Sequence, residues 1–365
     1  NHLVSHCAGR VTYWQCDNEP SNIGLSWAGT AEEYVAQLKV MHRAVKDADP
    51  EAAVVLGGAT YGLPAAPPES QERRFFDVLL REGRDHFDLF DLHLYAEAGR
   101  IPADVEAVRA MMRAFGYEKP VVAGEYNGPS VDQFPQAAGA LQETLAAAFG
   151  GSPPAGAPSG RTPEQAALAG LYEGMAALPP QLQMFMAGCP RDLAEKRDRI
   201  NRREIVMRNV QALAAGVRRI TCWNLAPEVP NYEDHLSMMD LFYGKFVLMG
   251  YEGAELNLRH ASGEAFALVA ERLAGVESVT RVQAPGPQGL HLFEVRRAGR
   301  GPMLVAWDQR DAFHGEDEPP IAVDWPWPAE RASAVDALGD VQLVEVGEGR
   351  VRLQVSLTPV FVAAD

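Results

Sequence analysis

Residues 11–22 are Val-Thr-Tyr-Trp-Gln-Cys-Asp-Asn-Glu-Pro-Ser-Asn, and this stretch decides the fold that we predict. It begins as an apolar run that is typical of a strand. The run stops at Asn18-Glu19-Pro20, where proline prevents a sheet ladder from continuing. Parallel α/β barrels place their catalytic groups at the carboxyl ends of their strands. Glu19 is therefore our first candidate for a catalytic carboxylate.

A second stretch, residues 119–128, has the same design. Its sequence, Lys-Pro-Val-Val-Ala-Gly-Glu-Tyr-Asn-Gly, is typical of a buried strand that ends in a carboxylate followed by turn residues. We predict that Glu125 is the catalytic partner of Glu19.

Strand and helix patterns alternate around these two stretches. The clearest helix has Thr30 as its N-cap and Glu33 three residues later, followed by apolar residues at helical spacing. The predicted strands are residues 11–17, 52–58, 87–95, 121–125 and 218–225, and the predicted helices are residues 29–49, 75–81, 103–115, 203–215 and 262–273. This alternation indicates βαβ units and a parallel sheet. We therefore predict an α/β fold of the (β/α)8 TIM-barrel type, present as a partial barrel.

The alternation breaks between residues 128 and 203. This long insertion has helical patterns at residues 136–149 and 164–177, on either side of a Pro-, Gly- and Ser-rich loop at residues 150–160. Long insertions after barrel strands usually shape the substrate cleft. We expect the insertion to cover the carboxyl ends of the strands, because it leaves the sheet directly after Glu125.

From residue 276 onward, short strand patterns separated by turns replace the helices. They are residues 291–296, 303–308, 321–325, 341–346, 351–355 and 360–363. This texture predicts a C-terminal antiparallel β-sandwich. The predicted organisation is a partial barrel domain at residues 1–275, with the insertion at 128–203, and a sandwich at 276–365. The run Trp325-Pro-Trp-Pro328 is either a sugar-stacking patch or, as we favour, an edge of the sandwich.

The composition limits the partners of the chain. Its 365 residues, of which 47% are hydrophobic, can bury a large core. A net charge of −16 repels nucleic acid and anionic membranes, so we expect neither partner and favour a neutral small molecule or polymer. The four cysteines lack CxxC spacing, and no run approaches the length of a transmembrane helix. His2, His6 and Cys7 have helix-like spacing for a metal, but a terminus without a fourth ligand disfavours a metal site.

Other strand ends add polar and aromatic side chains. Asp91, His93 and Tyr95 alternate along one predicted strand and therefore share a face. Trp223 lies near the end of the last predicted strand. Taken singly, an Asn-Glu-Pro motif is more often a turn with a solvated glutamate. A histidine such as His93 is more often a core residue, and a tryptophan such as Trp223 more often serves packing. Together at successive strand ends they favour a catalytic site, and two carboxylates with an aromatic platform suit glycoside cleavage.

Four short motifs at the strand ends resemble those of the retaining glycoside hydrolases of clan A. They are Asn-Glu-Pro at one strand end, His-x-Tyr two strands later, Gly-Glu one strand after that and Trp on the final strand. Within the clan, the order and spacing are similar to the β-xylosidase family 39 and to the cellulase-like family 5. The match covers residues 11–275, and the sandwich is similar to the accessory domain of several such families. The resemblance implies that Glu19, on the fourth barrel strand, is the acid/base and that Glu125, on the seventh, is the nucleophile.

The resemblance also implies a set of substrate-binding residues. Asn18 would bond the sugar 2-hydroxyl and Tyr95 would orient the nucleophile, whereas His93 would line the subsite and Trp223 would form its floor. The implied substrate is an oligo- or polysaccharide or a small glycoside. This mechanism requires no metal and no organic cofactor.

The chain has no counterpart of the first three barrel strands of the clan. We therefore expect a piece of a longer protein and an open barrel, with strand 11–17 at one edge and strand 218–225 at the other. The rival interpretation is a non-catalytic carbohydrate-binding protein or an inactive fragment of such an enzyme. Glutamates at both catalytic positions argue against this rival.

Hydrolysis with inversion is a further alternative, which geometry distinguishes from retention. Retention places the two carboxyl groups roughly 5–5.5 Å apart, whereas inversion needs roughly 6.5–9.5 Å to admit a water. At the shorter distance we expect Glu19 to carry the proton, while Tyr95 bonds the ionised Glu125.

Overall fold

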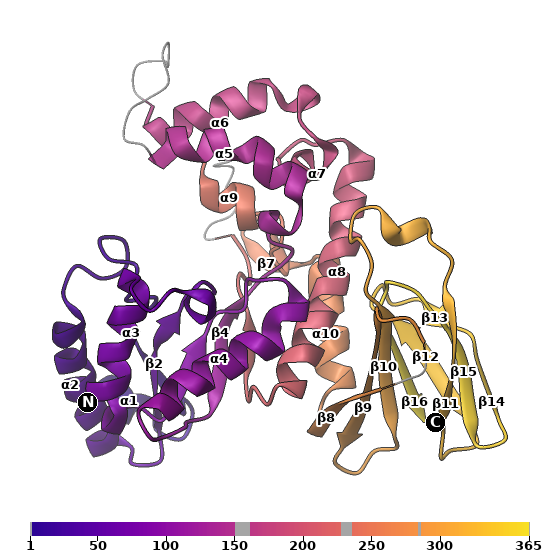
Figure 1. Cartoon of the computed structure of the whole chain (residues 1–365), viewed down its shortest axis with the longest axis horizontal. Coiled ribbons are helices and arrows are strands. Elements are labelled where there is room, and N and C mark those ends of the chain that lie inside the picture. The colour runs from indigo at the N-terminus through magenta and orange to yellow at the C-terminus, as the bar shows by residue number, and fades with distance from the viewer. Residues whose placement is uncertain (1, 150–160, 228–235, 284–285, 365) are drawn as a thin grey trace. The chain divides into compact units, whose positions relative to one another are not determined.

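The structure is a computed structural model that describes residues 2–149, 161–227, 236–283 and 286–364. Its elements (Figure 1) divide into two compact units, one comprising Asn1–Tyr126 and Gln211–Cys222 and the other Asn127–Val210 and Trp223–Asp365. The predicted loop at residues 150–160 lies outside the described residues. Each unit is described by itself, so the placement of the insertion over the strand ends stays a prediction. The predicted domain boundary at residue 275 also stays a prediction.

The first unit is built on a five-stranded parallel sheet in the order β1-β2-β3-β4-β5. Its strands are β1 (Tyr13–Cys16), β2 (Ala53–Ala59), β3 (Leu89–Leu92), β4 (Val121–Tyr126) and β5 (Ile220–Cys222). The two predicted edge strands are the observed edges. Strands β2 and β3 are buried along almost their whole length, as expected for parallel strands covered on both faces.

Helices α2 (Ala31–Ala48), α3 (Gln71–Glu82) and α4 (Ile101–Ala114) lie side by side against this sheet, and α1 (His2–Cys7) precedes β1 (Figure 1). Helix α2 begins with the predicted capping box, because the Thr30 hydroxyl accepts from the Glu33 amide and the Glu33 carboxylate accepts from the Thr30 amide. The buried Tyr34 hydroxyl bonds the Cys16 carbonyl and accepts from the Gly57 amide at 3.1 Å. Helix α2 therefore fixes the carboxyl end of β1 against β2.

The second unit begins with helices from the predicted insertion. They are α5 (Pro135–Phe149), α6 (Pro163–Glu173), α7 (Pro180–Gln183) and α8 (Arg191–Ala214), and they share a core that includes Leu141, Leu168, Phe185 and Ile200. Helix α8 starts well before the predicted residue 203. Helix α9 (Met238–Tyr243), the hairpin of β6 (Met249–Glu252) and β7 (Glu255–Arg259), and α10 (Ala261–Arg272) follow.

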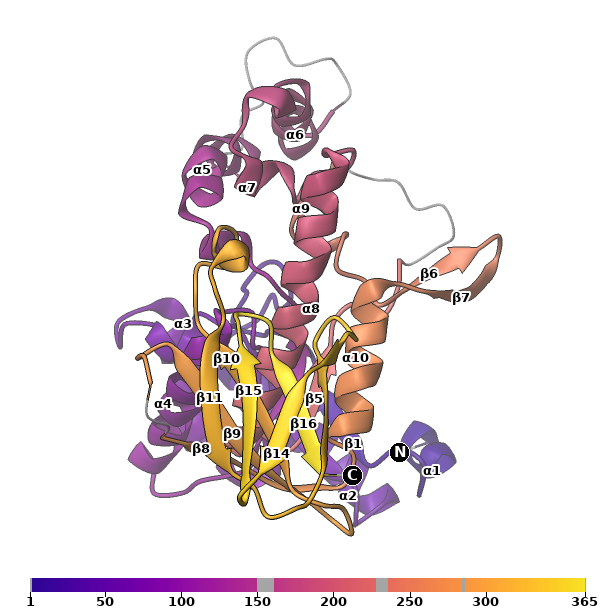
Figure 2. The ribbon, with the colours of Figure 1, turned by 90° about the vertical axis from the view of Figure 1, so that its right-hand side faces the viewer.

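The C-terminal part of the second unit is a β-sandwich (Figure 2). Its sheets have the strand orders β13-β12-β16-β10-β9-β8 and β11-β15-β14, and the residues packed between them include Leu292, Val323 and Val362. The strands are β8 (Val276–Val282), β9 (Leu290–Arg297), β10 (Met303–Asp308), β11 (Ile321–Pro326), β12 (Ala332–Asp336), β13 (Val341–Gln342), β14 (Val344–Gly347), β15 (Arg350–Val355) and β16 (Val360–Ala364). Strand β11, which carries Trp325, is an edge strand as predicted.

The parallel half-barrel sheet and the antiparallel sandwich confirm the predicted fold class, a partial barrel with a β-sandwich. The numbering of the five strands as four to eight of an eight-stranded barrel stays a prediction. Some boundaries were wrong. The strand predicted at residues 87–95 is only Leu89–Leu92, so His93 and Tyr95 lie beyond it, and the predicted strand 341–346 is two strands in different sheets, separated by the exposed Leu343. Among the described residues, no helix is both long and apolar enough to cross a membrane.

Candidate active site

Glu19 follows β1 in a tight turn. Asp17 and Glu19 both have left-handed backbones, with φ of 65° and 42°. A non-glycine residue in this region is strained, and such strain concentrates at functional sites. The Asn22 side-chain amide donates to Oε2 of Glu19 at 2.6 Å. The turn and this hydrogen bond hold a glutamate with a side chain that is 22% exposed at the carboxyl end of the sheet.

Glu125 lies on β4, and both of its carboxylate oxygens accept hydrogen bonds. The Tyr95 hydroxyl donates to Oε2 at 2.8 Å, and the Asn18 side-chain amide donates to Oε1 at 3.2 Å. Two donors from different strand ends fix the plane of the carboxylate. The contact that the resemblance implies between Tyr95 and Glu125 is present in the structure. Asn18 contacts Glu125 as well, which the sequence did not predict.

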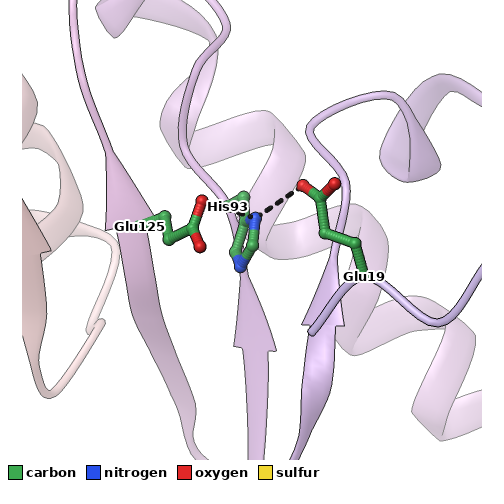
Figure 3. A group of neighbouring side chains, drawn as sticks. All are labelled: Glu19, His93 and Glu125. Carbon is green, nitrogen blue, oxygen red and sulfur yellow. Dashed lines mark hydrogen bonds and ion pairs between the residues drawn. The ribbon is translucent and has the colours of Figure 1, made fainter. Parts of the chain in front are cut away.

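His93 lies between the two glutamates (Figure 3). Its Nδ1 is 2.7 Å from Oε1 of Glu19 and 3.4 Å from Oε2 of Glu125. One carboxylate oxygen from each glutamate and the imidazole nitrogen all lie within 4.8 Å of one another. The His93 amide donates to the Ala59 carbonyl, which anchors the residue beyond the end of β3.

Strand β2 leaves room for this arrangement. Gly58 faces the His93 ring, and a Cβ atom there would overlap the imidazole. Its neighbour Gly57 faces the Tyr34 hydroxyl and the ring of Pro20. The two glycines were predicted as the end of the strand, and Gly58 also permits the close approach of the His93 ring. Because β2 presents no side chain at Gly58, His93, which follows β3 directly, reaches across to Glu19 beyond β1.

Asp91 completes the surroundings of the imidazole. Its side chain is fully buried, its Oδ1 accepts from the Gly124 amide at 2.5 Å, and its Oδ2 is 3.5 Å from Nε2 of His93. Burial alone would lower the pKa of His93, but hydrogen bonding to Asp91 and Glu19 and the charges of Asp91 and Glu125 raise it to about 10. A pKa in this range favours the protonated form of the imidazole at neutral pH.

A further carboxylate, Glu72 on α3, lies close to the pair. Burial raises the pKa of Glu72 above its ordinary value, the charge of Glu19 adds to this effect, and hydrogen bonds from Thr60 and Ser21 oppose it. The ring of Tyr61 meets that of Tyr95 edge-on at 6.3 Å. No strand-end pattern marks Glu72, because it belongs to the first turn of a helix, so sequence reasoning missed it.

Trp223 is the one predicted site residue that belongs to the second unit. Its ring meets that of Tyr243 edge-on at 5.2 Å, and both border a pocket of about 380 Å³. Asp240 and Lys245, an ion pair at 2.8 Å, also line this pocket. The structure therefore brings Asn18, Glu19, His93, Tyr95 and Glu125 together, whereas the position of Trp223 relative to them stays a prediction.

The Glu19, His93 and Glu125 atoms are of types that bind metal ions, and their spacing is compatible with a shared ion. A metal ligand must be a neutral imidazole with a free lone pair, whereas this imidazole faces carboxylates at both ring nitrogens. The three side chains are therefore better suited to surround a protonated histidine than to bind a metal ion. Among the described residues, no other group of three His, Cys, Asp or Glu side chains is close enough to hold a metal.

No protein-family model and no curated protein matches the chain. Solved structures do match. A family 39 glycoside hydrolase from the gut symbiont Bacteroides cellulosilyticus WH2 has a TM-score of 0.56 and 14% identity, over 100% of this chain and 60% of that one. A family 51 α-L-arabinofuranosidase from Bifidobacterium longum has a TM-score of 0.55 and 10% identity, over 96% of this chain and 66% of that one. The family 51 arabinofuranosidase of Xanthomonas axonopodis pv. citri has a TM-score of 0.55 and 10% identity, over 98% and 66%.

This chain therefore spans less than two thirds of the length of these structures. They confirm the predicted resemblance to glycoside hydrolases of family 39 at the level of the fold.

Proposed function

We propose that this protein is a glycosidase that hydrolyses O-glycosidic bonds with retention, with Glu19 as general acid/base and Glu125 as nucleophile. The observation that carries the proposal is the approach of one oxygen of Glu19 to within 4.8 Å of one oxygen of Glu125. A separation of roughly 5–5.5 Å between carboxyl groups is typical of retaining enzymes, because the nucleophile must reach the anomeric carbon directly. Inverting enzymes need roughly 6.5–9.5 Å.

The hydrogen bonds of the two glutamates support their different roles. Glu125 accepts from Tyr95 and Asn18, two neutral donors that orient the nucleophile. Glu19 accepts from the Asn22 side-chain amide at 2.6 Å and lies 2.7 Å from Nδ1 of His93, and these contacts orient its carboxyl group for the acid/base role. In this proposal Asn18 also bonds the sugar 2-hydroxyl, next to the reacting carbon. In this proposal Trp223 forms the floor of the subsite, and the insertion shapes the cleft.

The proposed substrate is an oligo- or polysaccharide or a small glycoside, of the kind cleaved by β-xylosidases, β-glucosidases or cellulases. In the mechanism, Glu125 attacks the anomeric carbon while Glu19 protonates the departing oxygen, which gives a glycosyl ester on Glu125. Glu19 then removes a proton from water, which attacks the ester and releases the sugar. The five strands correspond, in this proposal, to strands four to eight of the barrel.

A panel of aryl glycosides tests the proposal. The protein should hydrolyse at least one member, and Glu125→Gln should lose at least about 10³-fold in turnover, since a neutral amide cannot form the ester. Glu118→Gln is the matched control, because Glu118 precedes the same strand but forms a half-exposed ion pair with Arg113 at 2.7 Å. Sugar binding without hydrolysis by the unmodified protein would instead favour a non-catalytic carbohydrate-binding protein.

A further inference from the structure

Asp91 is a buried carboxylate that the proposed mechanism does not use. Its side chain is 0% exposed, as is that of His93. Oδ1 is occupied by the Gly124 amide, whereas Oδ2 makes one long contact, at 3.5 Å, with Nε2 of His93, and neither of these two atoms has a shorter hydrogen bond. Gly124 is required there, because a Cβ atom would overlap the carboxylate. A buried charge is costly unless it is paired, so Asp91 requires an explanation.

The charges around His93 supply that explanation. Three carboxylates face the one imidazole: Glu19 and Glu125 at Nδ1, and Asp91 at Nε2. A neutral histidine donates from one nitrogen only, so it would leave one side of the ring facing a carboxylate with a lone pair. A doubly protonated ring satisfies both sides. Without it, the two glutamates would repel each other at the distance that retention requires.

We propose that Asp91 is a positioning residue that keeps His93 charged, and that this buried cation holds Glu19 and Glu125 close together. The consequence for catalysis rests on the proposed function, whereas the charge state of His93 does not. The raised pKa of His93 agrees with this assignment.

The charged and aromatic groups that face the ring come from four segments. The turn after β1 contributes Glu19, β4 contributes Glu125, β3 contributes Asp91, and the segment after β3 contributes the Tyr95 ring, whose centroid is 6.2 Å from that of His93. Strand β2 contributes Gly58, which carries no charge.

Asp91→Asn separates this role from a purely structural one. The asparagine has the same shape, and its oxygen still accepts from the Gly124 amide, so the fold is kept. Its amide group then faces Nε2 as a donor, which disfavours a proton on that nitrogen. Asp88→Asn is the matched control, because Asp88 precedes the same strand, accepts from the Val54 amide at 2.8 Å and pairs with Lys46 at 2.9 Å.

The decisive measurement is an NMR titration of protein with 13C-labelled histidine, in which His93→Gln assigns one of the nine histidine signals. The His93 midpoint should lie near 10 in the unmodified protein. It should fall by about 3–4 pH units in Asp91→Asn and stay unchanged in Asp88→Asn. A midpoint below 7 in the unmodified protein, or equal midpoints in the Asp91→Asn and unmodified proteins, would overturn the proposal. The first of these results does not depend on the folding of Asp91→Asn.

The pH dependence of hydrolysis links the cation to catalysis. Asp91→Asn should reduce kcat/KM by more than about 10-fold at pH 8 and by less than about 3-fold at pH 5.5, because its imidazole loses the proton in between. A uniform loss across pH would indicate a structural role and would contradict the proposal. If no glycoside is hydrolysed, the proposed function fails, but the titration still decides the role of Asp91.

Discussion

The Tyr95 hydroxyl donates a 2.8 Å hydrogen bond to Oε2 of Glu125, the oxygen that also lies 3.4 Å from the imidazole of His93. One carboxylate oxygen is thus oriented by a neutral donor and by a cation. These contacts hold the Glu125 carboxylate in one orientation, and a nucleophile must be oriented toward the atom that it attacks.

Tyr95→Phe should therefore impair catalysis without unfolding the protein. A hydrogen bond to a charged group contributes about 1.5–3 kcal/mol, so kcat/KM should fall about 10–100-fold. Tyr117→Phe is the control, because it removes a hydroxyl with an equally short bond, 2.8 Å to the Leu80 carbonyl on α3. Comparable losses of kcat/KM in the two variants would contradict the role assigned to Tyr95.

The acid role of Glu19 predicts a dependence on the leaving group. Glu19→Gln should slow aryl glycosides with poor leaving groups by about 10²–10⁴-fold. Glycosides of 2,4-dinitrophenol should be slowed much less in the bond-breaking step, because their leaving group departs without a proton. Rates measured across a series of phenols test this expectation. The same loss for every phenol would show that Glu19 is not the acid.

Gly58→Ala tests the space that strand β2 leaves for His93. The added methyl would overlap the imidazole, so we expect a loss of about 1–3 kcal/mol in the free energy of unfolding, as for other overpacked sites. The His93 ring would also be displaced from Glu19, so hydrolysis should fall. Gly62→Ala is the control, because a Cβ atom there meets its nearest neighbours at ordinary distances of 3.5 Å or more. Urea unfolding and kcat/KM are the measurements, and a Gly58→Ala protein as stable and active as Gly62→Ala would be a contrary result.

The second unit offers an independent test of stability. Glu316 pairs with Arg199 at 2.8 Å and with Arg203 at 2.7 Å. Although burial opposes the effect, hydrogen bonds from these arginines lower the pKa of Glu316 from 4.5 to about 2. A lowered folded-state pKa stabilises the fold above pH 4.5, and this contribution is lost as the pH falls toward 2.

Glu316→Gln should consequently lower the free energy of unfolding by about 3–5 kcal/mol at pH 7, because Arg203 is left buried and unpaired. The difference from the unmodified protein should shrink steadily below pH 4.5. Urea unfolding of both proteins at several pH values measures this difference. A gap that is independent of pH would contradict the assignment of the effect to this charge.

Much of the site could be predicted from local signals. The strand that ends at Asn18-Glu19-Pro20 and the capping box at Thr30 depend on residues close together in the chain, so their patterns are visible without the fold. Five of the six predicted site residues lie together because the carboxyl ends of parallel strands meet at one edge of the sheet, a rule that applies once the strands are recognised.

The rest depends on contacts between strands, which no local pattern encodes. Gly58 was predicted only as the end of a strand, because nothing near it in the sequence indicates that it leaves room for the ring of His93, a residue 35 positions later in the chain. Asp91 was placed on the same face as His93 by parity, but its role requires the Gly124 amide of β4 as well. The break at Leu343 was missed because neighbouring strands, not local propensity, assign its two sides to different sheets.

The most direct test of the central claim is to trap the intermediate on Glu125. A 2-deoxy-2-fluoro glycoside with a good leaving group, chosen for the sugar that the protein hydrolyses, slows release of the sugar more than its attachment. Mass spectrometry of the intact protein should show one added fluorosugar, and peptide mapping should place it on Glu125. Glu125→Gln should take up none, whereas Glu118→Gln should be labelled normally. Steady hydrolysis of the parent glycoside with no covalent label, or a label on Glu19 or Glu72, would contradict the assignment of Glu125 as the nucleophile.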